Sequence, residues 1–403
     1  MSLCLNEIVK KCLTGSYSDT GSFPAPSAGA IYPYQFILAP HGADGAKFHS
    51  AFEIGDIGEV MEAGVLSDFE SISIYILYLP ERTVSKYGSR GFFYGLQDCG
   101  HVLGSLIAGA KTSGTPFRAR VFSGEKKIRS VFGRSGPVIV AAITLGGKRF
   151  DPFSPDVLGR IQELHPEVAL PFSESSWDSV RDAGWLGGME TLPLLNGMTW
   201  NDFSAAVTRR RSAEGFSGDC LGQARVVGLA KHASGAGLGA VFGPGVPIRV
   251  KAAIKEKTGV WNIYEQNGGQ PERQPLLENS LGLISNTFLG QGFTETSSSL
   301  ISFCLNSNSE RDLFDAGISS GFLGQMFYLA ATHMNVPICC VGGFEVLKLS
   351  NVLKNAKGSL PIYALVLGVG HVNGRKVDRE RESVPRVLSD LLGEVGKVSF
   401  QEV

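Results

Sequence analysis

Two stretches of this chain repeat one pattern, Gly104-Ser105-Leu106-Ile107-Ala108-Gly109-Ala110 and Gly324-Gln325-Met326-Phe327-Tyr328-Leu329-Ala330. They begin 220 positions apart, and at this shift Pro116 falls one residue before Pro337. Each stretch is followed by a turn, a short helical stretch (126–131; 345–353) and an apolar strand (137–146; 361–370). A repeated unit of this length exceeds the ~20–50 residues of a solenoid repeat. The pattern therefore predicts a domain-scale duplication.

Runs of β-branched residues predict strands at 31–38, 71–79, 138–145, 247–254, 298–305 and 362–369, and apolar periodicity predicts helices at 91–113 and 314–335. Because strands and helices alternate, we expect an α+β fold of two tandem domains, each a mixed β-sheet flanked by helices. The predicted domains are residues 1–150 and 201–403. Residues 151–200 are predicted to be a linker packed on them, because Trp177, Trp185 and Trp200 favour burial.

Composition excludes several classes of protein. The 403 residues carry a net charge of −1, which argues against nucleic acid or an acidic membrane as the main partner. Seven cysteines are scattered without a C-x-x-C pair, so neither a disulfide framework nor a zinc site is expected, and no metal is predicted. No apolar run is long enough to span a membrane and no secretory signal is evident, so a cytoplasmic location is expected.

Four short motifs carry potential chemistry. Residues 26–33 read Pro-Ser-Ala-Gly-Ala-Ile-Tyr-Pro, a loop of small residues that lets backbone and hydroxyl groups approach a planar ligand. Arg209-Arg210-Arg211-Ser212 follows a helical stretch and offers donors for a phosphate, although a solvated basic corner is an equal alternative. Val341-Gly342-Gly343-Phe344 joins a strand to a helix, and Lys86-Tyr87 pairs a cation with a phenol at a helix entry. An exposed Lys-Tyr pair is the ordinary alternative.

Together these motifs resemble the nitroreductase-like flavoproteins, and most closely the SagB/ThcOx (McbC-like) dehydrogenases. That family shows a Pro-Ser-Ala-Gly-Gly-Leu-Tyr-Pro loop, a Lys-Tyr-Gly-x-Arg-Gly segment before an Ala-Gly-His-x-x-Gln-Asn helix, and an Arg-Arg-Ser segment. It also shows a Gly-x-x-x-Gln-x-x-Tyr-Leu-Ala-Ala helix followed by Ile-Gly-Gly-Phe. The matching segments here are 26–33, 86–91, 98–101, 210–212, 321–331 and 341–344. The resemblance covers most of the chain, apart from the linker and the last thirty or so residues.

The resemblance implies FMN bound between two subunits or, here, between two fused halves. It implies that the cofactor is bound by Pro26, Ser27, Ala28, Gly29, Arg210, Arg211, Ser212, Gln325, Gly342 and Gly343, and that Lys86 and Tyr87 are catalytic. The first half lacks an Arg-Arg-Ser segment at its start, and the second half has His232-Ala233-Ser234-Gly235-Ala236-Gly237 where the small-residue loop would recur. These complementary losses predict an internal pseudo-dimer with one FMN, compatible with a monomer.

Two departures from the family accompany this match. Glu214 stands where family members carry arginine or lysine near the flavin N1/O2 edge, and a carboxylate there disfavours an anionic reduced flavin. Gly104 and Ser105 stand where the family helix has glutamine and asparagine. His101 is interpreted as a packed helix residue and not as a catalytic one.

The resemblance implies an FMN-dependent oxidoreductase that oxidises a thiazoline or oxazoline in a modified peptide or an amino-acid-derived natural product. The expected partners are that small-molecule or peptide substrate and other enzymes of a biosynthetic complex. Two alternatives stay open: a nitro- or enone-type reductase using NAD(P)H, and a flavin-binding pseudoenzyme that acts as a scaffold in a peptide-modifying complex.

Overall fold

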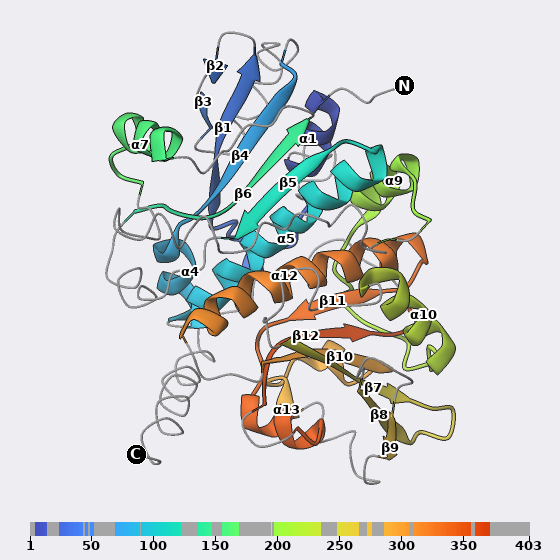
Figure 1. The fold of residues 1–403 in the computed structure, drawn as a ribbon. Coiled ribbons are helices and arrows are strands. Elements are labelled where there is room, and N and C mark those ends of the chain that lie inside the picture. Colours follow the sequence, from blue (N-terminus) through green and yellow to red (C-terminus); the bar gives the residue numbers. More distant parts are fainter. Residues whose placement is uncertain are drawn as a thin grey trace.

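The computed structural model describes residues 5–13, 24–42, 45–46, 49–51, 69–88, 90–121, 136–146, 155–168, 195, 197–234, 248–265, 272–275, 286–305, 310–355 and 359–370. Two β-sheets lie on either side of a pair of long helices (Figure 1). The six strands and two long helices that the sequence predicts are all present, with ends that shift by a few residues.

The two sheets share a strand order. The first has the order β2-β1-β4-β6-β5, with β3 paired to β1, and the second has the order β11-β12-β10-β7-β8-β9. Four strands of the first sheet, β1-β4-β6-β5, therefore correspond in order to β7-β10-β12-β11 of the second. The strands are β1 (Tyr34–Gly42), β2 (Gly45–Ala46), β3 (His49–Ala51), β4 (Ser71–Tyr78), β5 (Phe117–Val121), β6 (Val138–Gly146), β7 (Ile248–Lys255), β8 (Trp261–Glu265), β9 (Glu272–Pro275), β10 (Ser299–Leu305), β11 (Ile338–Val341) and β12 (Leu360–Leu367).

The expectation of mixed sheets is wrong for the described strands, because every pairing among them is antiparallel. The sequence places a long helix between β4 and β5, which suggests a parallel crossover. Instead β6 lies between these two strands and runs opposite to both: Ile74 on β4 faces Ile143 on β6, and Ala119 on β5 faces the same Ile143. The same insertion of β12 between β10 and β11 makes the second sheet antiparallel.

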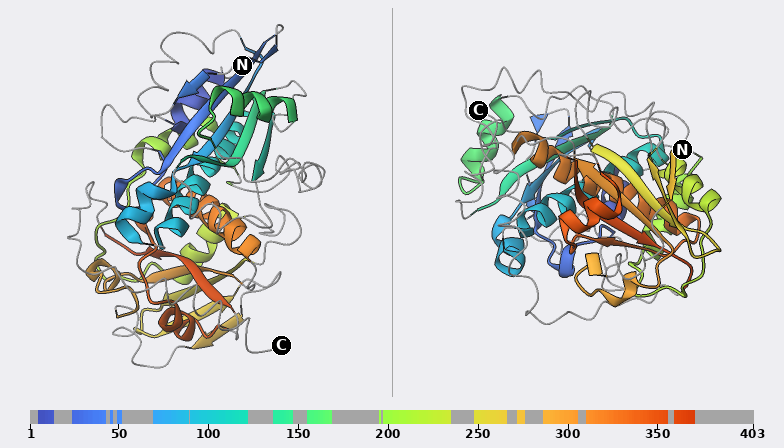
Figure 2. Two further views of the ribbon diagram at one scale, coloured as in Figure 1. Left: turned by 90° about the vertical axis from the view of Figure 1, so that its left-hand side faces the viewer. Right: turned by 90° about the horizontal axis from the view of Figure 1, so that it is seen from below.

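Helices fill the space between the sheets and cover their outer faces (Figure 2). Side chains alternate across each strand, so Leu300 and Val366 pack on α13 while Ile301 and Leu365 face the central helices. On the first sheet, Tyr75 packs on the outer side with α7. The helices are α1 (Leu5–Leu13), α4 (Pro80–Tyr87), α5 (Arg90–Ser113), α7 (Pro155–Leu164), α9 (Trp200–Arg209), α10 (Gln223–Ser234), α12 (Glu310–His333) and α13 (Val346–Val352), with short 3-10 turns η1 (Ala28–Ala30) and η5 (Gly292–Thr294).

The central contact is between α5 and α12, and glycines make it close. A Cβ added to Gly321 would overlap the carbonyl oxygen of Gln97, and one added to Gly100 would overlap the carbonyl oxygen of Ile318. Further along, a Cβ on Gly104 would lie 2.9 Å from Cβ of Gln325. The contacts advance in the same direction along both helices, so α5 and α12 run parallel, as Figure 1 also shows. Each helix thus packs near its own repeat in the other half.

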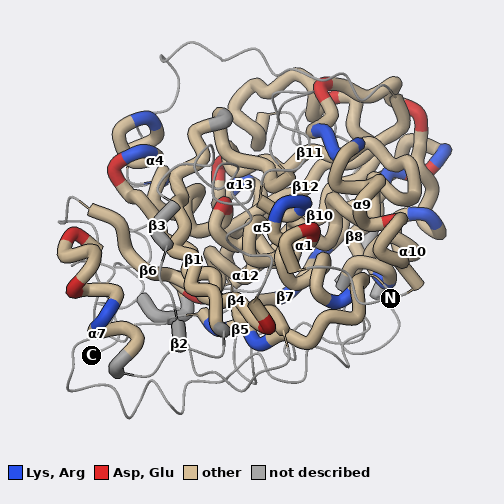
Figure 3. Tube along the Cα trace, turned by 90° about the horizontal axis from the view of Figure 1, so that it is seen from above, with Lys and Arg blue, Asp and Glu red and all other residues tan. Residues whose placement is uncertain are grey.

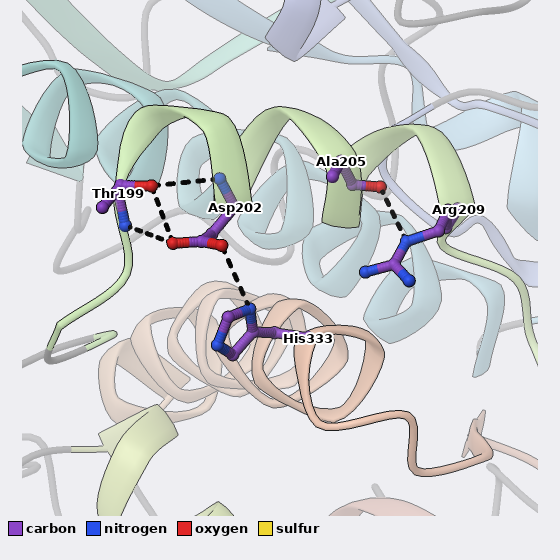
Figure 4. A network of polar contacts seen from close by, with 5 residues as sticks. All are labelled: Thr199, Asp202, Ala205, Arg209 and His333. Atoms are coloured by element: carbon purple, nitrogen blue, oxygen red, sulfur yellow. Dashed lines mark hydrogen bonds and ion pairs between the residues drawn. The ribbon is translucent and has the colours of Figure 1, made fainter.

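Helix α9 is fixed to α12 at its first turn (Figure 4). The hydroxyl of Thr199 accepts a hydrogen bond from the backbone N–H of Asp202, and the Asp202 carboxylate accepts from the backbone N–H of Thr199 at 3.0 Å, which is a capping box. The other carboxylate oxygen of Asp202 lies 3.8 Å from Nδ1 of His333 at the end of α12. Helix α9 ends at Arg209, and the remaining arginines follow it.

Charge is spread over the molecule. In the described part of the chain, Figure 3 shows lysine and arginine on several sides, with aspartate and glutamate between them. This distribution agrees with the net charge of −1. Among the described residues, no helix is long and apolar enough to cross a membrane.

The predicted linker contains structure at both ends. Helix α7 packs Leu158 and Ile161 on the outer face of the first sheet, and Trp200 begins α9. Trp177 and Trp185 lie outside the described residues, as does the helical stretch expected at 126–131, whereas the one expected at 345–353 is α13. The domain limits 1–150, 151–200 and 201–403 stay a prediction.

The α5–α12 contact gives a first testable prediction. We expect Gly321→Ala to lower the free energy of unfolding by about 1–3 kcal/mol, because the added methyl must displace the backbone of α5. Gly228→Ala in α10 is the matched control: a Cβ there meets nothing within 4 Å, so the change should stabilise by up to about 1 kcal/mol. Urea unfolding of both variants measures the difference. Equal effects at the two positions would contradict the close helix contact.

Candidate functional site

Segments from both halves contact the first turns of α5. They are the small-residue loop before β1, the end of α4, and the turn between β11 and α13. The segment after α9 lies apart from these turns, along Tyr328 of α12. The loop and α4 come from the first half, whereas the turn and the arginine segment come from the second.

The small-residue loop is attached to α5 through Asp98. The hydroxyl of Ser27 donates to Oδ2 of Asp98 at 2.6 Å, and the backbone N–H of Ala28 lies 3.3 Å from both carboxylate oxygens. Oγ of Ser27 in turn accepts from the backbone N–H of Tyr32 at 2.9 Å. Burial raises the pKa of Asp98 to about 8, although the bonds from Ser27 and Ala28 oppose the shift. The loop thus rests on one buried carboxyl group.

Gly29 brings this loop against the end of α4. Its φ of 60° is a left-handed conformation that glycine adopts at little cost. A Cβ at this position would overlap the hydroxyl of Tyr87 and lie 2.7 Å from Nζ of Lys86. The Lys86 ammonium is 5.5 Å from the centre of the Tyr87 ring. Lys86 and Tyr87, both half-buried, therefore face the loop together.

Tyr94 connects this group to the second half. Its ring lies edge-on to that of Tyr87, with centroids 5.1 Å apart and planes at 80°. The same ring occupies the space where a side chain at Gly342 would lie. The sequence interpretation assigns Gly342 to cofactor binding. In the described residues, the absence of a side chain at Gly342 makes room for the ring of Tyr94.

The turn from Gly342 to Phe344 is held from both halves. Arg90 on α5 donates through Nη2 to the carbonyl oxygen of Phe344 at 2.6 Å, and its guanidinium lies 5.0 Å from the Phe344 ring centre. Gln291 donates through Nε2 to the carbonyl oxygen of Gly343 at 2.8 Å. No described residue accepts a hydrogen bond from the backbone N–H of Gly342 or Gly343. The turn is thus fixed through its carbonyl groups while two adjacent donors are left available.

The arginine segment leaves α9 and passes along Tyr328. Arg210 is buried with its guanidinium 5.3 Å from the Tyr328 ring centre, while the hydroxyl of Ser212 bonds the Tyr328 hydroxyl at 2.8 Å. Arg211 is half-buried and donates to the carbonyl oxygen of Arg210 at 2.6 Å. Burial, and then the charge of Arg210, lowers the pKa of Arg211. Two cationic groups therefore lie close enough to disfavour each other.

Gln325 and His101 lie deeper, between the two long helices. Oε1 of Gln325 is 3.3 Å from Nδ1 of His101, and its amide nitrogen donates to Oγ of Ser105 at 2.8 Å and to the carbonyl oxygen of Pro24 at 3.4 Å. Nε2 of His101 is 2.9 Å from the hydroxyl of Tyr363. Burial holds the pKa of His101 down at about 3, so the ring is neutral. The structure therefore puts Gln325 and His101 in a fully buried network, and cofactor binding by Gln325 stays a prediction.

Glu214 lies two residues beyond Ser212 and is half-buried. Its Oε1 atom is buried and accepts no hydrogen bond from the described residues. Arg375, a further arginine that could meet a phosphate, lies outside the described residues. Within the described part of the chain, no group of three or more His, Cys, Asp or Glu residues is arranged to hold a metal ion.

Four residues of this arrangement are absent from the sequence-based assignment: Arg90, Tyr94, Asp98 and Gln291. Asp98 carries a detectable signal, because a carboxylate within the apolar run of a long helix is rarely buried without partners. Helix α4 is also new, since the sequence places Lys86 and Tyr87 at the entry of α5. Instead they form the last turn of a separate helix that starts at Pro80 and ends at Gly88, where φ is 61°.

Comparisons with known proteins agree on the fold. No protein-family model and no curated protein matches the sequence. A protein of Anabaena variabilis described as a nitroreductase superposes on 86% of this chain and 82% of its own, with a TM-score of 0.59 and 15% identity.

Two further structures align less well. The NfrA1 nitroreductase from B. subtilis covers 48% of this chain and 78% of its own, with a TM-score of 0.32 and 15% identity. The E. coli microcin synthetase McbBCD complex with truncated pro-MccB17 bound covers 31% of this chain and 53% of its own, with a TM-score of 0.26 and 14% identity. Both TM-scores are too low to indicate a shared fold. The likeness to the Anabaena protein extends over most of this chain, and the chain has a nitroreductase-like fold.

Proposed function

We propose that this protein is an FMN-dependent dehydrogenase that oxidises a thiazoline or oxazoline ring in a modified peptide or an amino-acid-derived natural product. One observation carries the proposal. Lys86 and Tyr87 face Gly29, and Tyr87 reaches Gly342 through the ring of Tyr94, so residues of both halves surround one place. An acid–base pair beside a turn with available N–H donors is what hydride removal with proton loss requires.

The residues present fit FMN at two points. Arg210 and Arg211 form a doubly cationic segment whose mutual repulsion a phosphate dianion would relieve. The available N–H groups of Gly342 and Gly343 suit the heteroatoms at a flavin edge. FMN, when bound, would supply a hydride acceptor.

The protein's own groups would provide the remaining steps. The Lys86–Tyr87 pair would provide the base that takes the proton leaving the substrate as its ring becomes aromatic. Only a deprotonated group can take this proton, so Tyr87 would act as the phenolate while Lys86, whose ammonium lies 5.5 Å from the ring centre, would balance its negative charge. The loop at Gly29 would limit how the substrate approaches both groups.

The chain has room for one such site. In the first half, α4 lies between β4 and α5 and carries Lys86 and Tyr87. In the second half, residues 306–309 alone separate β10 from α12, too few for a counterpart of α4. The arginines, conversely, follow α9, whereas α1 of the first half is followed by Thr14, Gly15 and Ser16. We therefore expect one FMN in each chain.

Glu214 favours a second candidate function, a flavin-binding scaffold without turnover. A half-buried carboxylate near the flavin would oppose a build-up of negative charge on the reduced ring. In that case the protein would bind flavin and assemble with peptide-modifying enzymes. The two candidates share the binding site and differ in catalysis.

The FMN proposal is tested by counting flavin. The purified protein, reconstituted with FMN and freed of excess, should release one flavin per chain on heating, measured by absorbance against protein concentration. A ratio near two would contradict the single site. A colourless protein that does not retain added FMN would contradict the proposal as a whole.

The arginine segment is tested by the affinity for FMN. Charged hydrogen bonds contribute roughly 1.5–3 kcal/mol each, so Arg210→Ala with Arg211→Ala should weaken FMN binding by about 10²-fold or more. Arg209→Ala is the matched control, because that side chain is exposed and bonds the carbonyl oxygen of Ala205 at the surface (Figure 4). A double variant that binds FMN as tightly as the control would place the phosphate elsewhere.

Catalysis is tested at Lys86 and Tyr87. We expect Lys86→Ala and Tyr87→Phe to retain FMN and to lose about 10²–10⁴-fold in kcat with an azoline peptide, since general acid–base groups contribute that much. Ser85→Ala controls for changes to α4, because its exposed hydroxyl bonds the carbonyl oxygen of Arg82. Unchanged turnover would remove the pair from catalysis. Wild-type protein that binds FMN but oxidises no azoline, and reduces nitro compounds with NAD(P)H or nothing at all, would favour an alternative function.

A further inference from the structure

The loop between Pro26 and Pro33 has an unfavourable backbone that needs support. Gly29 and Tyr32 both lie in the left-handed region, with φ of 60° and 50°. Glycine tolerates this conformation, but tyrosine seldom adopts it. A tyrosine held there therefore depends on contacts that outweigh its backbone preference.

Those contacts converge on Asp98. Its carboxyl group accepts from the hydroxyl of Ser27 and from the backbone N–H of Ala28, and Ser27 accepts from the backbone N–H of Tyr32. The bonds form one chain from α5 through the start of the loop to its strained end. Arg82 adds a bond from α4 to the carbonyl oxygen of Tyr32 at 3.3 Å.

We propose that Asp98 is a positioning residue that fixes this loop, and with it Gly29, against Lys86 and Tyr87. Only the expected effects of Asp98 on catalysis and on FMN binding rest on the proposed function. The anchoring itself is a property of the protein without cofactor. Asp98 is 3% exposed and acts through Ser27 and Ala28, not by touching a substrate.

The first test measures the anchor directly in the protein without FMN. Asp98→Ala and Ser27→Ala should each speed hydrogen exchange at the amides of Ala28 and Tyr32 by tenfold or more. In each variant one amide loses its acceptor, and the other keeps an acceptor that has lost its own bond to the Ser27–Asp98 pair. Asp98→Asn retains an acceptor oxygen and should restore much of the protection. Exchange at these amides that is the same in the wild type and both alanine variants would overturn the proposal.

The control is Asp219→Ala. Asp219 accepts a hydrogen bond from Ser217 at 2.7 Å, the same Ser-to-Asp pairing, but both residues are exposed. This variant should leave exchange at Ala28 and Tyr32 unchanged. If it raises exchange there as much as Asp98→Ala does, the effect is general loosening and the proposal fails.

A second test uses FMN affinity and a double-mutant cycle. Asp98→Ala and Ser27→Ala should each weaken FMN binding by about tenfold, and the double variant should be little worse than either alone, since both remove one chain of bonds. Additive losses would overturn a shared role. If the wild type binds no FMN, the proposed function fails while the exchange test still decides the anchor.

The buried carboxyl group also predicts a pH dependence of stability. With a pKa near 4 in the unfolded chain and about 8 in the folded protein, Asp98 holds a proton that unfolding releases between these values. The free energy of unfolding should therefore fall as pH rises from 6 to 8, up to a tenfold loss in the folding equilibrium constant per pH unit. Asp98→Asn lacks this group and should show a correspondingly smaller fall.

Other groups around Asp98 do not titrate in this range. Tyr34 on β1, Tyr78 on β4, Cys99 on α5 and Tyr363 on β12 face it, and burial raises the pKa of each well above its ordinary value. Parallel pH profiles for the wild type and Asp98→Asn, measured by urea unfolding, would contradict a raised pKa of Asp98 in the folded protein. The bonds from Ser27 and Ala28 would then offset the effect of burial.

Discussion

The close contact between α5 and α12 determines the rest of the structure. Because Gly100 and Gly321 have no side chains, each helix packs directly on the backbone of the other. Both helices carry a sheet on their outer side, so their separation fixes the distance between the two sheets. The largest buried cluster spans both sheets and both helices, which means that neither half completes its core alone. The stretches that repeat in the sequence therefore lie on the two helices whose contact joins the halves.

The same contact places the candidate site. Tyr94 and Asp98 lie on α5 within one or two turns of Gly100, so each is held at a fixed distance from the second half. Tyr94 lies on Gly342 across the interface, while Asp98 bonds the loop that reaches Lys86 and Tyr87. A small shift between the helices would alter both contacts together. The site thus depends on helix packing more than on the loops that form its surface.

The sequence predicts the elements well and their pairing less well. Apolar strands and the helix repeat are visible because periodicity is a local property, and all six predicted strands exist. The antiparallel order is not local, since it depends on β6 and β12 inserting between strands that precede them. The motifs at 26–29, 86–87, 210–212 and 342–343 are found from the sequence, yet the residues that hold them are not. Arg90 and Gln291 contact the turn at Phe344 and Gly343 from segments distant in the chain, which no spacing rule reveals.

The fold is repeated, but the polar groups of the site are not. The two sheets share a strand order, and each sheet packs in the same way on one of the two central helices. In the proposed site, the cationic segment at Arg210 follows α9 of the second half, whereas Lys86 lies at the end of α4 in the first half. A second copy would need another helix where residues 306–309 connect β10 to α12. Four residues are too few for that helix. The two halves are therefore alike in packing, but only the first has a helix α4 and only the second has the arginine segment.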